Sequence, residues 1–422
     1  MSEHAPRRRR VPAFAAFGVR SFRYQFSADL CTAWAIEMEV LVLAWYVLVE
    51  TDSAFMVALI GVARFAGTLV TPWFGTLSDR LPRKAMLLGV RALFTVLAIA
   101  LAGAALSGAL RPWHAFAVAT VSGLFRPADM MLRQSLIGDT VAHSMLVGAM
   151  GFARTTLDTA RIVGALAGGA IMAALGIGTA YVVVAVFYLS STLLSLGIAA
   201  PMRNDATAAS QSWRDFKAGL DYVAHSPKIH SLLWLAFLVN FAGLCVTGGL
   251  LPVVARDVYA MDEVGLGFLV ATFATGALVG SISVATILRG IRAESMMALA
   301  MVVWHLALGG FAFTERPSVG IPLLGFIGFW SSLVMVPLSS SLLAITHRDY
   351  RGRIMGLRQL AVVGLPLGLL GAGTIVELAG TTIAIAAVGL VGVGSGVGIH
   401  FSWRRIDREH ASLHPVRADS AD

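Results

Sequence analysis

Residues 75–84 read GTLSDRLPRK and place one acid and three bases between two long apolar stretches. The whole chain has 422 residues, of which 57% are hydrophobic and 13% charged, and its mean hydropathy is +0.77. A soluble protein of this length needs a much more polar surface. The cluster therefore marks a short polar loop between two segments that lie in a membrane.

Apolar runs of about twenty residues recur along the chain, and each is long enough to cross roughly 30 Å of hydrocarbon as a helix. Lipid cannot satisfy backbone groups, and the runs lack the period-two alternation of a membrane β-barrel, so we expect helices. Twelve spans are predicted, with these approximate limits: 24–49, 53–77, 85–108, 113–137, 145–175, 178–200, 230–255, 264–288, 294–314, 319–345, 354–378 and 381–403.

The basic residues predict the topology. Of 32 Lys and Arg residues, 24 fall in segments on the same side as the N-terminus and only three in the opposite loops. This positive-inside bias places both termini in the cytoplasm. It also explains the net charge of +8 by topology and by contact with membrane lipids, rather than by nucleic-acid binding. Only three of the basic residues are lysine, which suggests a bacterial genome rich in G and C and hence the bacterial inner membrane.

A polar stretch in the middle divides the chain into two sets of six spans. The expected domains are a basic cytoplasmic N-terminus, an N-terminal six-helix bundle, a cytoplasmic linker, a C-terminal six-helix bundle and a cytoplasmic tail. Their limits are 1–23, 24–200, 201–229, 230–403 and 404–422.

The 75–84 loop follows the predicted second span, and here the chain resembles the major facilitator superfamily of transporters. Its signature at this place is Gly-x-Leu-x-Asp-Arg-x-Gly-Arg-Lys, and Pro82 replaces the second glycine. The matching residues are Gly75, Leu77, Asp79, Arg80, Arg83 and Lys84. The resemblance implies an all-α membrane protein with twelve transmembrane helices in two pseudo-symmetric six-helix bundles.

The same resemblance implies that the signature gates the transport cycle. Asp79 would lie at the positive N-terminal end of span eleven, near 351–356, and the bases would hold the loop to acids or lipid phosphates. Such contacts form on one side of the cycle and break on the other. The alternative is an ordinary basic loop that only fixes topology.

Two further stretches, 123–141 and 148–169, are similar to the branch that contains macrolide and siderophore exporters. Arg126 falls where many proton-coupled members carry a buried arginine. Span five resembles an antiporter motif, Gly-x-x-x-Gly-Pro-x-x-Gly-Gly, with alanine at two of its positions. Its matching glycines are Gly164, Gly168 and Gly169.

Glycines four residues apart let membrane helices approach closely. Two such pairs occur in spans eight and eleven: Gly276 with Gly280, and Gly364 with Gly368. By resemblance, spans five and eight meet across the interface of the halves, as do spans two and eleven.

Placing a charged side chain in mid-membrane costs at least about 2.5 kcal/mol. Charged residues within the spans are therefore expected to have ion-pair partners or a functional role. Spans four and five each carry a base–acid–base ladder on one face. The members are Arg126, Asp129 and Arg133, then Arg154, Asp158 and Arg161. The ladders suggest a shared polar network, which is either a static lattice of ion pairs or a conformational or proton-linked device.

Span one adds three acids, and Arg64 of span two is expected at the same depth as two of them. One acid would neutralise Arg64 and leave the other to bind a proton; a fixed ion pair is the alternative. The candidate proton carriers are Glu37 or Glu39, then Asp129, with Asp29 as a further candidate.

The C-terminal half has few charges within its spans. Asn240 offers a hydrogen bond to a bulky amphiphile, and Trp234, Trp304 and Trp330 offer flat surfaces. Packing against lipid or other helices is the alternative for these aromatic residues.

Together these features predict a secondary active transporter that exports amphiphilic small molecules, drug-, macrolide- or siderophore-like, against protons by alternating access. Proton- or ion-coupled uptake of a small metabolite is the alternative. A membrane enzyme or a non-transporting sensor fits less well, because the loops show no catalytic pattern and no appended domain is present. No phosphate-binding loop of an ATP-driven pump occurs. The resemblance implies a monomer. We expect no catalytic residues and no cofactor, and the isolated Cys31 and Cys245 predict neither a disulfide framework nor a metal site.

Overall fold

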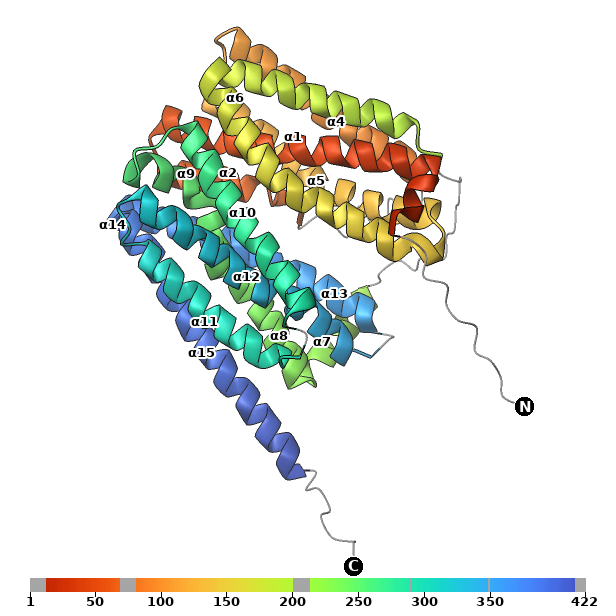
Figure 1. The fold of residues 1–422 in the computed structure, drawn as a ribbon, viewed down its shortest axis with the longest axis vertical. Coiled ribbons are helices and arrows are strands. Elements are labelled where there is room, and N and C mark those ends of the chain that lie inside the picture. Colours follow the sequence, from red (N-terminus) through yellow and green to blue (C-terminus); the bar gives the residue numbers. More distant parts are fainter. Residues whose placement is uncertain (1–12, 69–80, 200–212, 289, 348–349, 414–422) are drawn as a thin grey trace, which may run out of the picture.

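The computed structural model describes residues 13–68, 81–199, 213–288, 290–347 and 350–413. Within these ranges the chain forms helices and turns and no strand. The helices are arranged in two bundles, one built from the N-terminal half and one from the C-terminal half (Figure 1).

The N-terminal bundle begins with a 3-10 turn, Ala13–Gly18. Its helices are α1 (Arg20–Thr51), α2 (Ala54–Ala63), α4 (Arg83–Leu106), α5 (Pro112–Thr140) and α6 (Leu146–Leu196). α6 contains two predicted spans, because Gly176 has φ 78° and ψ 169° and redirects the chain between them. Residues other than glycine avoid this backbone region.

The C-terminal bundle follows a linker helix, α7 (Trp213–Ala224). Its helices are α8 (Pro227–Leu238), α9 (Leu251–Val253), α10 (Glu263–Thr286), α11 (Ala293–Phe311), α12 (Pro317–Ile345), α13 (Arg351–Leu360), α14 (Gly364–Ala379) and α15 (Thr381–Leu413). The seventh span runs continuously from Pro227 to Val258 but contains three π-helical segments, Val239–Gly243, Val246–Leu250 and Val254–Val258. Such segments are frequent at functional sites.

The predicted fold class is confirmed. In the described part of the chain, nine helical segments are long and apolar enough to cross a membrane. One of these, Gly148–Leu196, contains two crossings that meet at Gly176. The shorter apolar segment Ala54–Thr68 and the charged helix α5 complete the twelve predicted spans.

The bundles meet along two seams. α6 packs against α10 and α2 packs against α14, which confirms the expected contacts of span five with eight and of span two with eleven. Gly169 lies against the backbone of Glu263, and a Cβ atom at Gly373 would come 2.5 Å from the Cβ of Ala58. In Figure 1 the bundles converge where α2, α9 and α14 lie and diverge toward α13 and the start of α1.

The last helix is longer than expected. The sequence predicts that span twelve ends at 403, whereas α15 continues to Leu413. Its 33 residues extend roughly 50 Å, which exceeds the hydrocarbon thickness, so its basic end lies beyond the apolar layer. The domain limits stay predictions.

Candidate functional site

A cavity of about 310 Å³ lies between the two bundles. The N-terminal bundle contributes residues of α1, α2 and α6, and the C-terminal bundle contributes the seventh span, α10 and α14. Most of its wall is apolar and includes Leu41, Val57, Ile60, Phe65, Leu244, Leu266, Phe273 and Leu365. A mostly apolar cavity with a few polar groups is typical of small-molecule sites.

Five polar side chains line the cavity: Glu37, Arg64, Arg161, Asn240 and Thr247. The first three come from the N-terminal bundle and the last two from the seventh span. The structure therefore brings four of the sequence candidates together at one site. Thr247 was missed, because its π-helical position determines where its side chain points and the sequence pattern does not reveal such a segment.

Two of these side chains have unsatisfied polar atoms. Within the described residues, Arg64 Nε and Thr247 Oγ1 are buried and have no hydrogen-bond partner. Asn240 donates its side-chain amide to the carbonyl oxygen of Ala236 at 2.8 Å. Buried polar groups are nearly always paired, so these two atoms have hydrogen-bonding capacity that a ligand in the cavity can use.

Arg64 has charged neighbours but forms no ion pair with another described residue. Glu37, Glu39 and Arg126 are close enough to interact electrostatically with its guanidinium. The Glu39 carboxylate is buried and accepts a hydrogen bond from the Tyr188 hydroxyl at 2.7 Å. Glu37, in contrast, faces the cavity.

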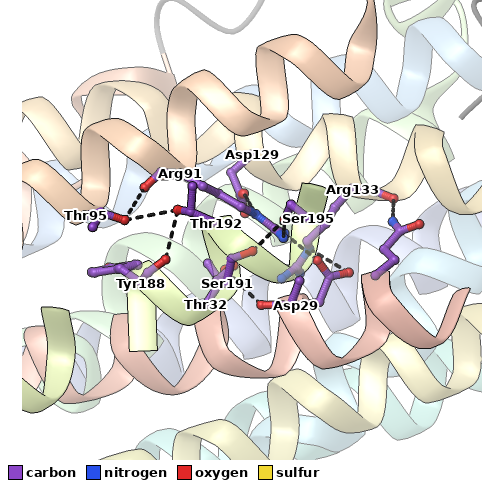
Figure 2. Close-up of polar contacts among 12 residues, drawn as sticks. Asp29, Thr32, Arg91, Thr95, Asp129, Arg133, Tyr188, Ser191, Thr192 and Ser195 are labelled. Atoms are coloured by element: carbon purple, nitrogen blue, oxygen red, sulfur yellow. Dashed lines mark hydrogen bonds and ion pairs between the residues drawn. The ribbon is translucent and has the colours of Figure 1, made fainter. Parts of the chain in front are cut away.

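A second polar cluster lies inside the N-terminal bundle, around the fully buried Arg91 of α4 (Figure 2). Its Nε atom donates to Asp129 at 3.2 Å, one Nη atom donates to the Ser195 hydroxyl at 2.6 Å, and the other pairs with Asp29. Arg133 Nε lies 3.9 Å from the second oxygen of Asp29. The cluster joins α1, α4, α5 and α6 with two acids and two bases.

Arg91 was not among the predicted site residues, although it is the centre of this cluster. An isolated arginine in the apolar run of span three was the available signal. Its presence changes the environment of Asp29 and Asp129, because both carboxylates are already paired with it. Removing one partner of such a buried pair leaves an uncompensated charge. Of the two predicted roles these contacts favour the static lattice, which stays a prediction.

The two predicted ladders do not form one network in the described residues. Asp129 and Arg133 belong to the cluster around Arg91. Arg154 and Asp158 pair with each other along α6 at 3.2 Å, and the Arg154 side chain is 71% exposed. Arg161 lines the cavity.

None of the three candidate tryptophans lines the cavity. Trp304 is fully buried and its ring packs against Gly243 of the seventh span. Trp234 is 53% exposed and stacks on Phe237. Trp330 packs between phenylalanines of its own helix.

Four residues of the gating signature, Gly75, Leu77, Asp79 and Arg80, lie outside the described residues. Arg83 pairs with both oxygens of Asp139, at 3.0 and 2.9 Å. Lys84 donates to the carbonyl oxygen of Leu196 at 2.8 Å. These two bases hold the start of α4 to the ends of α5 and α6, within the N-terminal bundle.

The seven candidate glycines all lie at close helix approaches, mostly inside one bundle. Gly164 and Gly168 face α1, Gly276 and Gly280 face α12, and Gly364 and Gly368 face the seventh span. Gly169 alone among the seven contacts the other bundle. The pairs in α10 and α14 therefore hold neighbouring helices together rather than forming the seams.

Polar contacts bridge the bundles where they converge, and we call this end the closed rim. Glu377 of α14 accepts hydrogen bonds from the Ser53 hydroxyl at 2.5 Å and from the Phe55 amide at 3.1 Å. Arg256 pairs with Asp52 at 2.7 Å and donates to the carbonyl oxygen of Leu48 at 2.9 Å. The Glu377 carboxylate thus lies at the positive N-terminal end of α2.

Comparison with known proteins agrees with this architecture. A family model described as "Transmembrane secretion effector" matches residues 11–419. The multidrug efflux pump Tap of Mycobacterium tuberculosis is 26% identical over 392 residues, covering 88% of this chain and 90% of Tap. The enterobactin exporter EntS of Escherichia coli is 24% identical over 306 residues, covering 71% of each chain.

Solved structures with the same fold include the nucleoside transporter NupG, with a TM-score of 0.71 and 15% identity over 92% of this chain and 99% of NupG. The peptide-family transporter PepTSo has a TM-score of 0.73 and 12% identity with the same coverage. At these identities the likeness concerns the fold alone.

Proposed function

Since the chain belongs to the transmembrane secretion effector family of the major facilitator superfamily, we propose that it exports amphiphilic small molecules in exchange for protons. The observation that carries this proposal is the cavity between the bundles, whose apolar wall contains the acid Glu37 and the base Arg64. An apolar wall accepts the body of an amphiphile, and an acid in the same space can carry a proton. The similarity to Tap and EntS, which are named as exporters, supports the direction of transport.

Transport follows from rocking of the two bundles about the cavity. In the structure the bundles are held together at the closed rim and diverge toward the opposite end (Figure 1). Breaking the closed rim and closing the other end would expose the cavity on the opposite side. This is alternating access with each bundle moving as a body.

The excess of Lys and Arg near the N-terminal side supports a cytoplasmic location for both termini. With this orientation the closed rim faces outward and the structure is open toward the cytoplasm. The gating signature would then latch the inner end in the opposite state, with Asp79 at the start of α13. The inner membrane of a bacterium is the corresponding location, and a monomer suffices because one chain supplies both bundles.

Glu37 is the proton carrier in this proposal, and Glu39 is the second candidate. Glu37 lines the cavity and forms no ion pair with a described residue, whereas Asp29 and Asp129 are occupied by Arg91. Arg64 holds positive charge next to the carrier, so the protonated and ionised forms of Glu37 differ in how they interact with it. Inward movement of one proton yields about 2.3 kcal/mol per 100 mV of membrane voltage.

Purified protein in liposomes with an imposed pH gradient tests this function. A fluorescent amphiphile should leave the compartment that gains protons, and only while the pH gradient is present. Glu37→Gln should abolish this dependence. Glu315→Gln, an exposed acid away from the cavity, is the matched control. Full proton dependence in Glu37→Gln and in Glu39→Gln would show that neither acid is the carrier.

A further inference from the structure

Positive charge exceeds negative charge around the central cavity. The cavity is lined by Glu37, Arg64 and Arg161. Glu39 and Arg126 interact electrostatically with Arg64. Together these residues are two acids and three bases. The neighbouring cluster around Arg91 adds nothing to this balance, because it contains two acids and two bases. The C-terminal bundle contributes only neutral residues to the wall.

The positive charge is also available to a ligand. Within the described residues Arg64 Nε has no hydrogen-bond partner. The nearby Glu39 carboxylate is instead bound to the Tyr188 hydroxyl. A guanidinium presents its donors in a planar fork that matches the two oxygens of a carboxylate.

The opposite wall offers neutral hydrogen bonds. Thr247 Oγ1 is buried and unpartnered in the described residues, and Asn240 lines the same cavity from the same span. Around these groups the surface is aliphatic or aromatic, with residues such as Leu244, Val270 and Phe273. The cavity therefore has a cationic side, a side with neutral polar groups and an apolar body.

We propose that the cavity selects amphiphiles that carry an oxyanion, such as a carboxylate, which binds to Arg64 while the apolar body fills the remaining space. This inference rests on the proposed function for the identity of the cavity as the substrate site. Arg161 adds to the attraction, and Glu37 opposes it as long as Glu37 is ionised. A cationic amphiphile is repelled by two arginines in the wall and attracted by only one acid, so it binds most weakly. A membrane voltage that is negative inside also favours exit of an anion.

A matched series of probes tests the head-group preference. Naphthaleneacetate, naphthaleneacetamide and naphthylethylamine share one apolar body and carry charges of −1, 0 and +1 at pH 7. Their binding to purified protein in nanodiscs of neutral lipid can be measured by calorimetry. The acid should bind about tenfold more tightly than the amide, and the amine should bind most weakly.

Three variants assign the preference to its residues. Arg64→Gln should weaken acid binding much more than amide binding, so that the acid-to-amide ratio falls from about ten toward one. Glu37→Gln should strengthen acid binding severalfold, because it removes the opposing charge. Arg316→Gln, an exposed base outside the cavity, should leave all three affinities unchanged.

The proposal is overturned if the amine binds most tightly, if the acid does not bind, or if Arg64→Gln keeps the acid preference. Failure of the exporter proposal is distinguishable, because it shows in the liposome assay and not in binding. If the affinities follow the expected order but the liposomes show no proton-driven movement, the head-group inference stands and the transport function is rejected.

Discussion

Glu377 at the closed rim provides the sharpest test of the rocking mechanism. Its carboxylate accepts two hydrogen bonds from the start of α2, one from Ser53 and one from the Phe55 amide. These bonds join the two bundles at the closed rim, and the rocking mechanism predicts that they break when the rim opens. Replacing Glu377 by Gln keeps an acceptor oxygen but removes the negative charge from the positive end of α2.

The magnitude follows from the exposure of this site. A hydrogen bond to a charged group contributes about 1.5–3 kcal/mol in favourable cases, and a charge at a helix terminus contributes about 0.3–1 kcal/mol. Glu377 is exposed, so solvent screens both contributions. We therefore expect Glu377→Gln to destabilise the closed rim by about 1 kcal/mol, which raises the population of open-rim molecules roughly fivefold.

Distance measurements between spin labels at Glu50 and Leu378 report the rim directly, since both positions are exposed. The background should lack the native Cys31 and Cys245. The population at long distances should rise in Glu377→Gln, and Glu315→Gln should match the parent protein. An unchanged distance distribution in Glu377→Gln would refute the assignment of this contact as a latch.

Three further outcomes are expected. Arg91→Leu removes the nearest cation from two buried carboxylates, of which Asp29 keeps only the longer contact to Arg133, and should lower unfolding stability by about 3–5 kcal/mol, seen as a lower Tm in detergent; an unchanged Tm would contradict a structural lattice. Gly373→Ala places a Cβ atom 2.5 Å from that of Ala58, so it should open the closed rim, and Ala58→Gly in the same chain should restore it; no rescue would place the effect elsewhere. Tyr188→Phe removes the hydrogen bond to Glu39 and should cost about 1–3 kcal/mol in the same Tm assay, whereas no loss would show that water replaces the hydroxyl.

The twelve spans were predictable because lipid imposes helices of a minimum length, and hydropathy reveals that length directly. The turn between spans five and six fell close to its predicted place because a glycine at 176 permits the unusual backbone there. The seams could be anticipated as well, through the resemblance to a known superfamily. The length of α15 could not, because a helix that extends beyond the membrane has no hydropathy signal at its end.

The pairing of charges was harder to predict. A ladder on one face of a helix identifies which residues point together, but not which neighbouring helix they face. Arg91 binds Asp29 and Asp129 from two other helices, and no sequence spacing encodes that contact. The tryptophans show the same limit, because an aromatic residue in a span can face lipid, as the exposed Trp234 does, or pack inside the bundle like Trp304.

On two helices the residue at the seam differs from the residue in the cavity wall. On α6, Arg161 faces the cavity while Gly169 contacts the other bundle; on α14, Leu365 faces the cavity while Gly373 contacts α2. In the proposed mechanism, wall residues such as Arg161 and Leu365 can therefore be varied to change cargo preference while Gly169 and Gly373 stay at the seams. An exporter for a new compound would best be sought by varying wall positions and holding these two glycines constant.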